Sequence, residues 1–166
     1  AHRKPLAGPS AADRRACADA LSATGLADHA NTPLGSLSGG QKQRAWIAMV
    51  LAQESGTILL DEPTNHLDVS HAMEVLELVR RLNRDAGRSI VVVLHDLNLA
   101  ARYADHVVLF DQGRVIAQGP VADVLTEPLL SQVYGIDLRI LHPEGLDYPI
   151  IVPLKVRGAV SGMVSD

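Results

Sequence analysis

The sequence predicts an α/β fold in which helices flank a mainly parallel sheet. Two apolar runs, Thr57–Leu60 and Ser89–Leu94, are short and unbroken, which is typical of strands buried within a parallel sheet. Ser70–Ala86 lies between them and carries apolar residues at helical spacing. Strands that alternate with helices in this way indicate an α/β domain.

Two helices are expected before the first of these strands. Ser10 followed by Asp13 resembles a capping box, so a helix is predicted over residues 11–23. Ser38 is a suitable N-cap, and a helix-forming run over residues 41–53 follows it. The second helix therefore leads directly to the strand at Thr57.

The predicted elements after the second strand are short. A helix is expected over residues 97–104, followed by a hairpin with strands at 106–110 and 115–117. The remaining elements are two helices and then two strands, at residues 121–126, 128–134, 138–141 and 149–153. Residues 155–166 are small and polar and are expected to form a disordered tail.

The composition argues against several classes of protein. The 166 residues carry a net charge of −4, which disfavours a general nucleic-acid binder. No apolar run approaches the ~20 residues of a membrane span, and no secretory signal is found. Cys17 is the single cysteine, so no internal disulfide can form and a reducing compartment is expected.

Two adjacent carboxylates, Asp61 and Glu62, end the first predicted strand. Pro63 cannot continue a strand ladder, so the pair lies at the carboxyl end, where open α/β sheets place their ligands. Neighbouring side chains on a strand point to opposite sides, so the two can do different work. One can help to hold Mg²⁺, and the other can orient and deprotonate a water. The alternative is a solvated acidic turn.

A glycine-rich helix start lies upstream of this strand. Ser38 is followed by Gly39 and Gly40, which let a ligand come close to the backbone, and then by Gln41. The free N–H groups of a helix start form an anion site. An ordinary capped helix after a turn is the alternative, because Ser-Gly-Gly alone is a weak motif.

Together these motifs resemble the nucleotide-binding subunits of ABC (ATP-binding cassette) ATPases. Leu37–Gln41, reading Leu-Ser-Gly-Gly-Gln, is similar to the family's signature motif. Ile58–Asp68, reading Ile-Leu-Leu-Asp-Glu-Pro-Thr-Asn-His-Leu-Asp, is similar to its Walker B strand and D-loop. His95, after the next strand, stands where the family has a histidine that contacts the γ-phosphate, although a histidine bonded at a sheet edge is the alternative.

The resemblance implies a role for each of these residues. In complete family members, two subunits sandwich two ATP molecules head to tail, so that each ATP touches the P-loop of one subunit and the signature of the other. Asp61 would hold Mg²⁺ through water, Glu62 would activate the attacking water, and His95 would position the γ-phosphate. The implied nucleotide-binding set is Ser38, Gly39, Gly40, Gln41, Asp61 and Asp68, with Asp68 facing the partner subunit.

One family motif, the P-loop Gly-x-x-x-x-Gly-Lys-[Ser/Thr], does not occur in the sequence. The resemblance covers residues 1–153 but only the second half of a full subunit, so the fold is expected to be a partial P-loop NTPase fold without its central strand. Residues 1–53 would be the remainder of the helical signature subdomain and 54–154 the end of the ATPase core. Such a fragment is expected to be inactive alone, and its bare sheet edges predict oligomerisation, swapping or a rearranged sheet.

Downstream residues favour an importer subunit for iron–siderophore, haem or cobalamin uptake. His95–Asp105 and Asp111–Pro120 are both similar to such importers, whereas translation-associated members carry an arginine where Leu97 stands. The implied partners are a second ABC subunit in a head-to-tail homodimer, a transmembrane permease and, indirectly, a solute-binding protein, at the inner face of the cell membrane. The alternatives are a non-transport ABC protein and a non-catalytic partner that lends only its signature surface.

Overall fold

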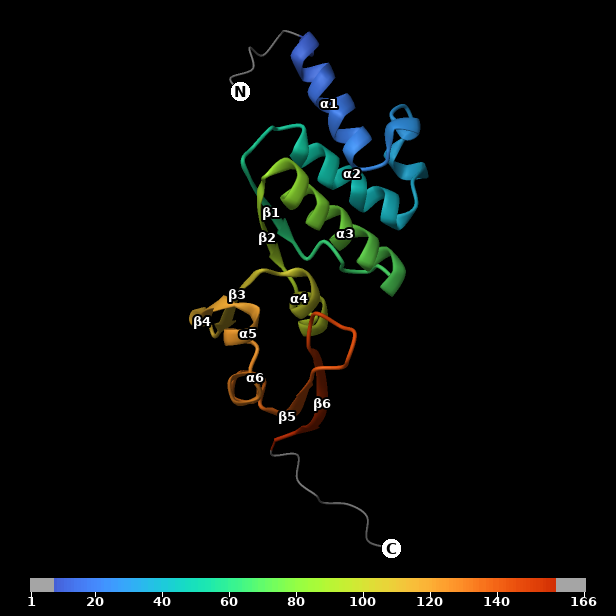
Figure 1. Ribbon diagram of the computed structural model, residues 1–166. Helices are drawn as coiled ribbons and strands as arrows, with labels where there is room; N and C mark the ends of the chain where they lie inside the picture. The colour runs from blue at the N-terminus through green and yellow to red at the C-terminus, as the bar shows by residue number, and fades with distance from the viewer. Residues whose placement is uncertain (1–7, 158–166) are drawn as a thin grey trace, which may run out of the picture. The chain divides into compact units, whose positions relative to one another are not determined.

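The computed structural model describes residues 8–157. These form two compact units divided between Leu94 and His95, and each is described by itself (Figure 1). The first unit contains, in chain order, α1 (Ala11–Ala23), the single 3₁₀ turns η1 (Ala27–His29) and η2 (Leu34–Ser36), α2 (Gly39–Leu51), β1 (Thr57–Asp61), α3 (Val69–Ala86) and β2 (Ser89–Val93).

Strands β1 and β2 form a parallel pair, as predicted, and α3 is the connection between them. Their register pairs Asp61, the last residue of β1, with Val93, the last residue of β2. A parallel pair needs a long crossover, which the α3 helix supplies. The carboxyl ends of the two strands therefore lie side by side.

Only one face of this strand pair is covered, which differs from the predicted burial within a sheet. Ile58 and Leu60 are 1% and 9% exposed, whereas Leu59, which points to the other face, is 72% exposed. Val91 of β2 is likewise 54% exposed. The reason is that α2 and α3 both pack on the face that carries Ile58 and Leu60.

The core of the first unit joins three helices to β1. Its buried members are aliphatic, as the low aromatic content of 3% requires. They are Ala20 of α1, Ile47, Ala48 and Leu51 of α2, Ile58 and Leu60 of β1, and Val75, Leu78, Val79 and Leu82 of α3. This core includes residues from both sides of residue 53 and lies within the unit that ends at Leu94. The boundary at 53/54 between the signature subdomain and the ATPase core stays a prediction.

The first helix forms as its capping signal predicts. The Asp13 backbone N–H donates to Ser10 Oγ at 3.1 Å, and the Ser10 N–H donates to Asp13 Oδ2 at 2.8 Å. This reciprocal pair satisfies two of the donors that a helix start leaves open. The helix then runs over residues 11–23, as expected.

The second unit consists of a short helix, two hairpins and two further helices. Its elements are α4 (Leu97–Tyr103), β3 (His106–Asp111), β4 (Arg114–Pro120), α5 (Val121–Val124), α6 (Glu127–Tyr134), β5 (Ile136–Leu141) and β6 (Ile150–Val156). Leu130 of α6 is fully buried at the centre of its core. The Asn98 side chain ties α4 to β6, because its amide donates to the Ile151 carbonyl at 3.1 Å and accepts from the Ile151 N–H at 2.7 Å.

The strand pairs qualify the prediction of a mainly parallel sheet. Both pairs in the second unit, β3–β4 and β5–β6, are antiparallel. The links between their strands are loops too short for the crossover that parallel pairing requires. The pairs β1–β2 and β3–β4 belong to separate sheets, and the missing central strand stays a prediction.

The prediction of a disordered tail over residues 155–166 is wrong for its first residues. Lys155 and Val156 belong to β6, where they pair with Asp137 and Ile136, and residues 158–166 lie outside the described part of the chain. Between residues 8 and 157, no helix combines the length and the apolar character needed to cross a bilayer.

Candidate functional site

The glycine-rich motif forms the first turn of α2. The Gln41 N–H donates to Ser38 Oγ at 3.2 Å, and the Ser38 N–H donates to Gln41 Oε1 at 2.9 Å. With Ser38 as the cap, the helix begins at Gly39, two residues earlier than expected. Gly39 and Gly40 therefore lie within the positive end of the helix, where an anion is stabilised.

Gly40 allows a close approach between α2 and α3. It is buried, and a Cβ built on it would lie 2.6 Å from His71 Cδ2. A Cβ on Gly39 would lie 3.8 Å from Leu67 Cδ2, which is ordinary contact. The start of α2 thus packs directly against the loop before α3 and against the first turn of α3.

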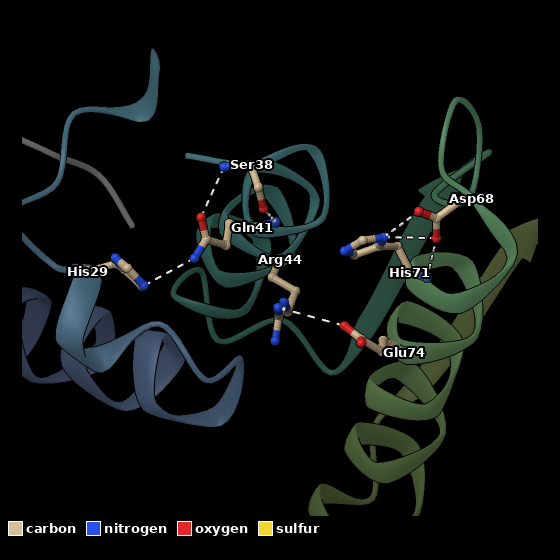
Figure 2. Close-up of polar contacts among 7 residues, drawn as sticks. All are labelled: His29, Ser38, Gln41, Arg44, Asp68, His71 and Glu74. Carbon is tan, nitrogen blue, oxygen red and sulfur yellow. Dashed lines mark hydrogen bonds and ion pairs between the residues drawn. The ribbon is translucent and has the colours of Figure 1, made fainter. Parts of the chain in front are cut away.

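Asp68 caps α3 and holds the His71 ring. The His71 backbone N–H donates to Asp68 Oδ1 at 2.9 Å, and His71 Nδ1 lies 2.8 and 2.9 Å from the two carboxylate oxygens (Figure 2). The backbone hydrogen bond, followed by the one from the ring, lowers the pKa of the Asp68 carboxyl below its ordinary value. Asp68 therefore holds the Nδ1 side of the ring while the Cδ2 side faces Gly40.

An ion pair joins the two helices about one turn further along each. Arg44 Nη2 lies 3.7 Å from Glu74 Oε2, and both side chains are partly exposed, so the pair contributes little to stability (Figure 2). The ion pair instead helps to orient α2 relative to α3, because it is a second point of contact between them besides Gly40 and His71.

The acidic pair lies at the end of β1. Asp61 is the last residue of the strand and is exposed. Glu62 follows with a φ of +46°, a left-handed conformation that is uncommon for residues other than glycine. The Asn65 N–H donates to the Glu62 carbonyl at 3.0 Å, and Asn65 Nδ2 donates to Glu62 Oε2 at 2.9 Å. The Asn65 contacts therefore fix the direction of the Glu62 carboxylate.

His95 is the first residue of the second unit. His95 is exposed and lies two residues after Val93, which pairs with Asp61 in the strand register. Asp96 next to it caps α4 by accepting hydrogen bonds from the Asn98 and Leu99 N–H groups at 2.7 and 3.1 Å. The approach of His95 to the carboxylates of the first unit stays a prediction.

Several residues of this site were not predicted from the sequence. They are His29, which contacts Gln41, and Arg44, Asn65, His71 and Glu74. Asn65 and His71 each lie three residues after the carboxylate that they contact. This spacing is common in turns and helix caps, so the sequence could have indicated both contacts. His29 gives no such local signal, because it contacts Gln41 from twelve residues away.

The acidic strand end offers the kind of donor that Mg²⁺ binds together with waters and phosphates. Among residues 8–157, no group of three or more His, Cys, Asp or Glu side chains is arranged to hold a metal ion. Mg²⁺ in nucleotide sites is bound through one or two carboxylates together with waters and substrate phosphates. The single exposed carboxylate of Asp61 fits that chemistry.

Comparison with known proteins relates the chain to one family. The ABC transporter family profile matches residues 3–65. The chain is 46% identical over 142 residues to the ferric enterobactin transport ATP-binding protein FepC of Escherichia coli, covering 86% of this chain and 52% of that protein. It is 48% identical over 132 residues to the hemin import ATP-binding protein HmuV of Rhodococcus jostii, covering 79% of this chain and 45% of that protein. The chain spans about half the length of the relatives that it matches.

Solved structures give the same result for the fold. A chain of an ABC transporter described as of metal-chelate type, in an inward-facing conformation, aligns with a TM-score of 0.84 and 28% identity, over 92% of this chain and 61% of that one. The dimeric post-hydrolysis state of the ATP-binding cassette MJ0796, bound to ADP and Pi, aligns with a TM-score of 0.57 and 34% identity, over 70% and 50%. The fold is therefore part of the P-loop NTPase fold of ABC ATPases.

Proposed function

Because the chain belongs to the ABC transporter family of ATP-binding domains, we propose that it provides the signature motif and the acidic strand end of an ATP-hydrolysing importer subunit. The names of its relatives support iron–siderophore complexes as the cargo, with haem as the next choice. Cobalamin is the third candidate, supported by the downstream sequence motifs alone. The cargo itself would be selected by the permease and by a solute-binding protein.

One observation carries the proposal: the start of the signature helix packs directly against the D-loop and α3. Gly39 faces Leu67, Gly40 faces His71, and His71 is fixed by Asp68. The two motifs that the family places against a partner subunit are thus in direct contact with each other. A nucleotide bound by the partner would meet both at once.

The signature would act on a nucleotide held by the P-loop of a second subunit. Ser38, Gly39, Gly40 and Gln41 lie at the positive end of a thirteen-residue helix. The N–H groups and the dipole of such an end stabilise the negative charge of a terminal phosphate. The dimeric cassette structure bound to ADP and Pi supports a two-subunit arrangement for this chain as well.

The acidic strand end would supply the chemistry on the chain's own nucleotide. Asp61 would hold Mg²⁺, which neutralises phosphate charge when bound. Glu62 would accept a proton from the attacking water, and the Asn65 amide 2.9 Å from its Oε2 orients the carboxylate for that task. His95 would contact the γ-phosphate. Hydrolysis would separate the two subunits and drive a permease, with the chain at the cytoplasmic face of the membrane.

A rescue experiment tests the signature role. A P-loop-bearing relative, such as the enterobactin subunit, is disabled in its own signature, and hydrolysis of ATP is measured with and without this chain. We expect the chain to be inactive alone and to restore hydrolysis in the mixture. Ser38→Arg places a bulky cation at the helix start and should abolish the rescue, whereas Ser10→Ala, in the matching cap of α1, should leave it intact. No rescue by the unaltered chain would contradict the proposal.

A second candidate is a non-catalytic signature donor, which the capped start of α2 supports equally well. The two are separated by joining the preceding half of the enterobactin relative to this chain, which supplies a P-loop. Hydrolysis by the fusion supports a catalytic subunit. A fusion that binds ATP without hydrolysing it, while the chain still rescues the disabled relative, supports the donor. Recovery with ribosomes rather than with a permease would instead indicate a non-transport protein.

A further inference from the structure

We propose that His29 is a positioning residue for the signature glutamine and that it acts in one tautomer only. His29 ends the 3₁₀ turn η1, and its Nε2 lies 3.1 Å from Gln41 Nε2 (Figure 2). The contact is partly buried and spans twelve residues of sequence. Its consequence for catalysis rests on the proposed function of Gln41, but the contact itself does not.

The hydrogen-bond chain fixes which atom donates at each step. The Ser38 backbone N–H has only a hydrogen to offer, so the Gln41 atom 2.9 Å away must be the oxygen Oε1. The other end of that amide, Nε2, carries two hydrogens and must donate to His29. His29 Nε2 therefore accepts, and a nitrogen that accepts carries no proton. The proton of a neutral ring must then lie on Nδ1.

The other side of the ring agrees with this assignment. Thr32 Oγ1 lies 3.5 Å from His29 Nδ1, at the limit of hydrogen bonding, and its oxygen can accept the Nδ1 proton. The backbone holds the ring in place, because the Thr32 N–H donates to the His29 carbonyl at 2.9 Å and the His29 N–H donates to that of Leu26 at 3.0 Å. Leu26 is 2% exposed, so the turn is anchored in the core.

The result is a glutamine side chain whose two ends are both occupied before any nucleotide arrives. Gln41 Oε1 completes the capping box with Ser38, and Nε2 is held by His29. Fixing a flexible side chain in advance lowers the entropy that binding must remove. Loss of His29 should therefore raise the ATP concentration needed for half-maximal rescue by about two- to tenfold, the equivalent of immobilising one such side chain.

The tautomer is tested on the unaltered, ¹⁵N-labelled full chain by long-range proton–nitrogen correlation, at about pH 8, above the ordinary histidine pKa of about 6.5. We expect a protonated Nδ1 and an unprotonated Nε2 for His29. In His29→Phe, which keeps a ring but no acceptor, the Gln41 side-chain amide resonances should shift. His29→Gln can place an amide oxygen near the Nε2 position and should return them toward the native shifts. His142→Phe, an exposed histidine of the second unit, is the matched control.

The same variants enter the rescue assay. His29→Phe should raise the half-maximal ATP concentration, while His29→Gln and His142→Phe should behave as the unaltered chain. A proton on His29 Nε2, or Gln41 amide resonances that are the same in His29→Phe, overturns the proposal whatever the assay shows. If the unaltered chain does not restore ATP hydrolysis by the signature-disabled relative, the proposed function is wrong. The resonance data then still decide, by themselves, whether His29 holds the Gln41 side chain.

Discussion

Gly40→Ala is the substitution that most sharply tests how the signature helix is held. The new Cβ would lie 2.6 Å from His71 Cδ2, about one ångström inside ordinary contact. The ring cannot turn away freely, because Asp68 holds its Nδ1 at 2.8 and 2.9 Å. Either the ring leaves Asp68 or the two helices separate at this point.

Two opposing effects set the change in unfolding free energy caused by Gly40→Ala. Alanine favours a helix over glycine by about 1 kcal/mol. Overpacking costs about 1–3 kcal/mol, and giving up the Asp68 hydrogen bond falls within that range. The difference between these effects is a destabilisation of the first unit by up to about 2 kcal/mol in Gly40→Ala. In a His71→Ala background the obstruction is gone, so the same change should be neutral or should stabilise by up to about 1 kcal/mol.

The assay is a double-mutant cycle in urea. Trp46, the single tryptophan, lies on α2 and reports on the first unit by its fluorescence. The coupling energy between Gly40→Ala and His71→Ala should be about 1–3 kcal/mol, with the double variant more stable than the two single effects predict. Equal destabilisation by Gly40→Ala in both backgrounds would refute the contact as the cause.

Three further outcomes follow from the same cluster and the acidic turn. Ser38→Ala and Ser10→Ala each remove one capping box and should cost about 0.5–2 kcal/mol in urea unfolding, but only Ser38→Ala should also weaken the rescue of a signature-disabled relative. Because the pKa of Asp68 is lowered in the folded state, its carboxylate stabilises the fold above the ordinary value of 3.8, and this stabilisation is lost as the pH falls through the folded pKa. In a carboxyl NMR titration, His71→Ala should raise the Asp68 pKa only part of the way toward the ordinary value, because the backbone N–H of residue 71 remains. An unchanged pKa would show that the His71 ring does not lower it. Glu62→Gln in the fusion should abolish hydrolysis and spare ATP binding, and unchanged turnover would remove Glu62 from the proposed chemistry.

Local signals in the sequence were reliable where a few neighbouring residues decide the structure. Ser10 with Asp13 predicted the first helix, and Ser38 predicted the cap of the second, because a cap depends on residues three apart. The strand that ends at Asp61 was predicted for a similar reason: an apolar run stops at a proline.

Features that depend on distant segments were not predictable in this way. The contact of Gly40 with His71 requires α2 and α3 to lie side by side, and no spacing in the sequence reports that. The exposure of Leu59 depends on what covers the second face of the strand pair, and the helices of this unit cover only the first. The roles of Asp61, Glu62 and His95 stay predictions, because they concern a nucleotide and a partner subunit.

The central claim is that the start of α2 meets a nucleotide bound by another subunit, and cross-linking tests it most directly. Cys17→Ala removes the exposed native thiol, and Ser38→Cys places one at the helix cap. This variant is mixed with a relative that carries one cysteine at the edge of its P-loop, and mild oxidation is applied. We expect a disulfide-linked heterodimer that forms with ATP and not without nucleotide. Equal cross-linking in both conditions, or none in either, would contradict the account.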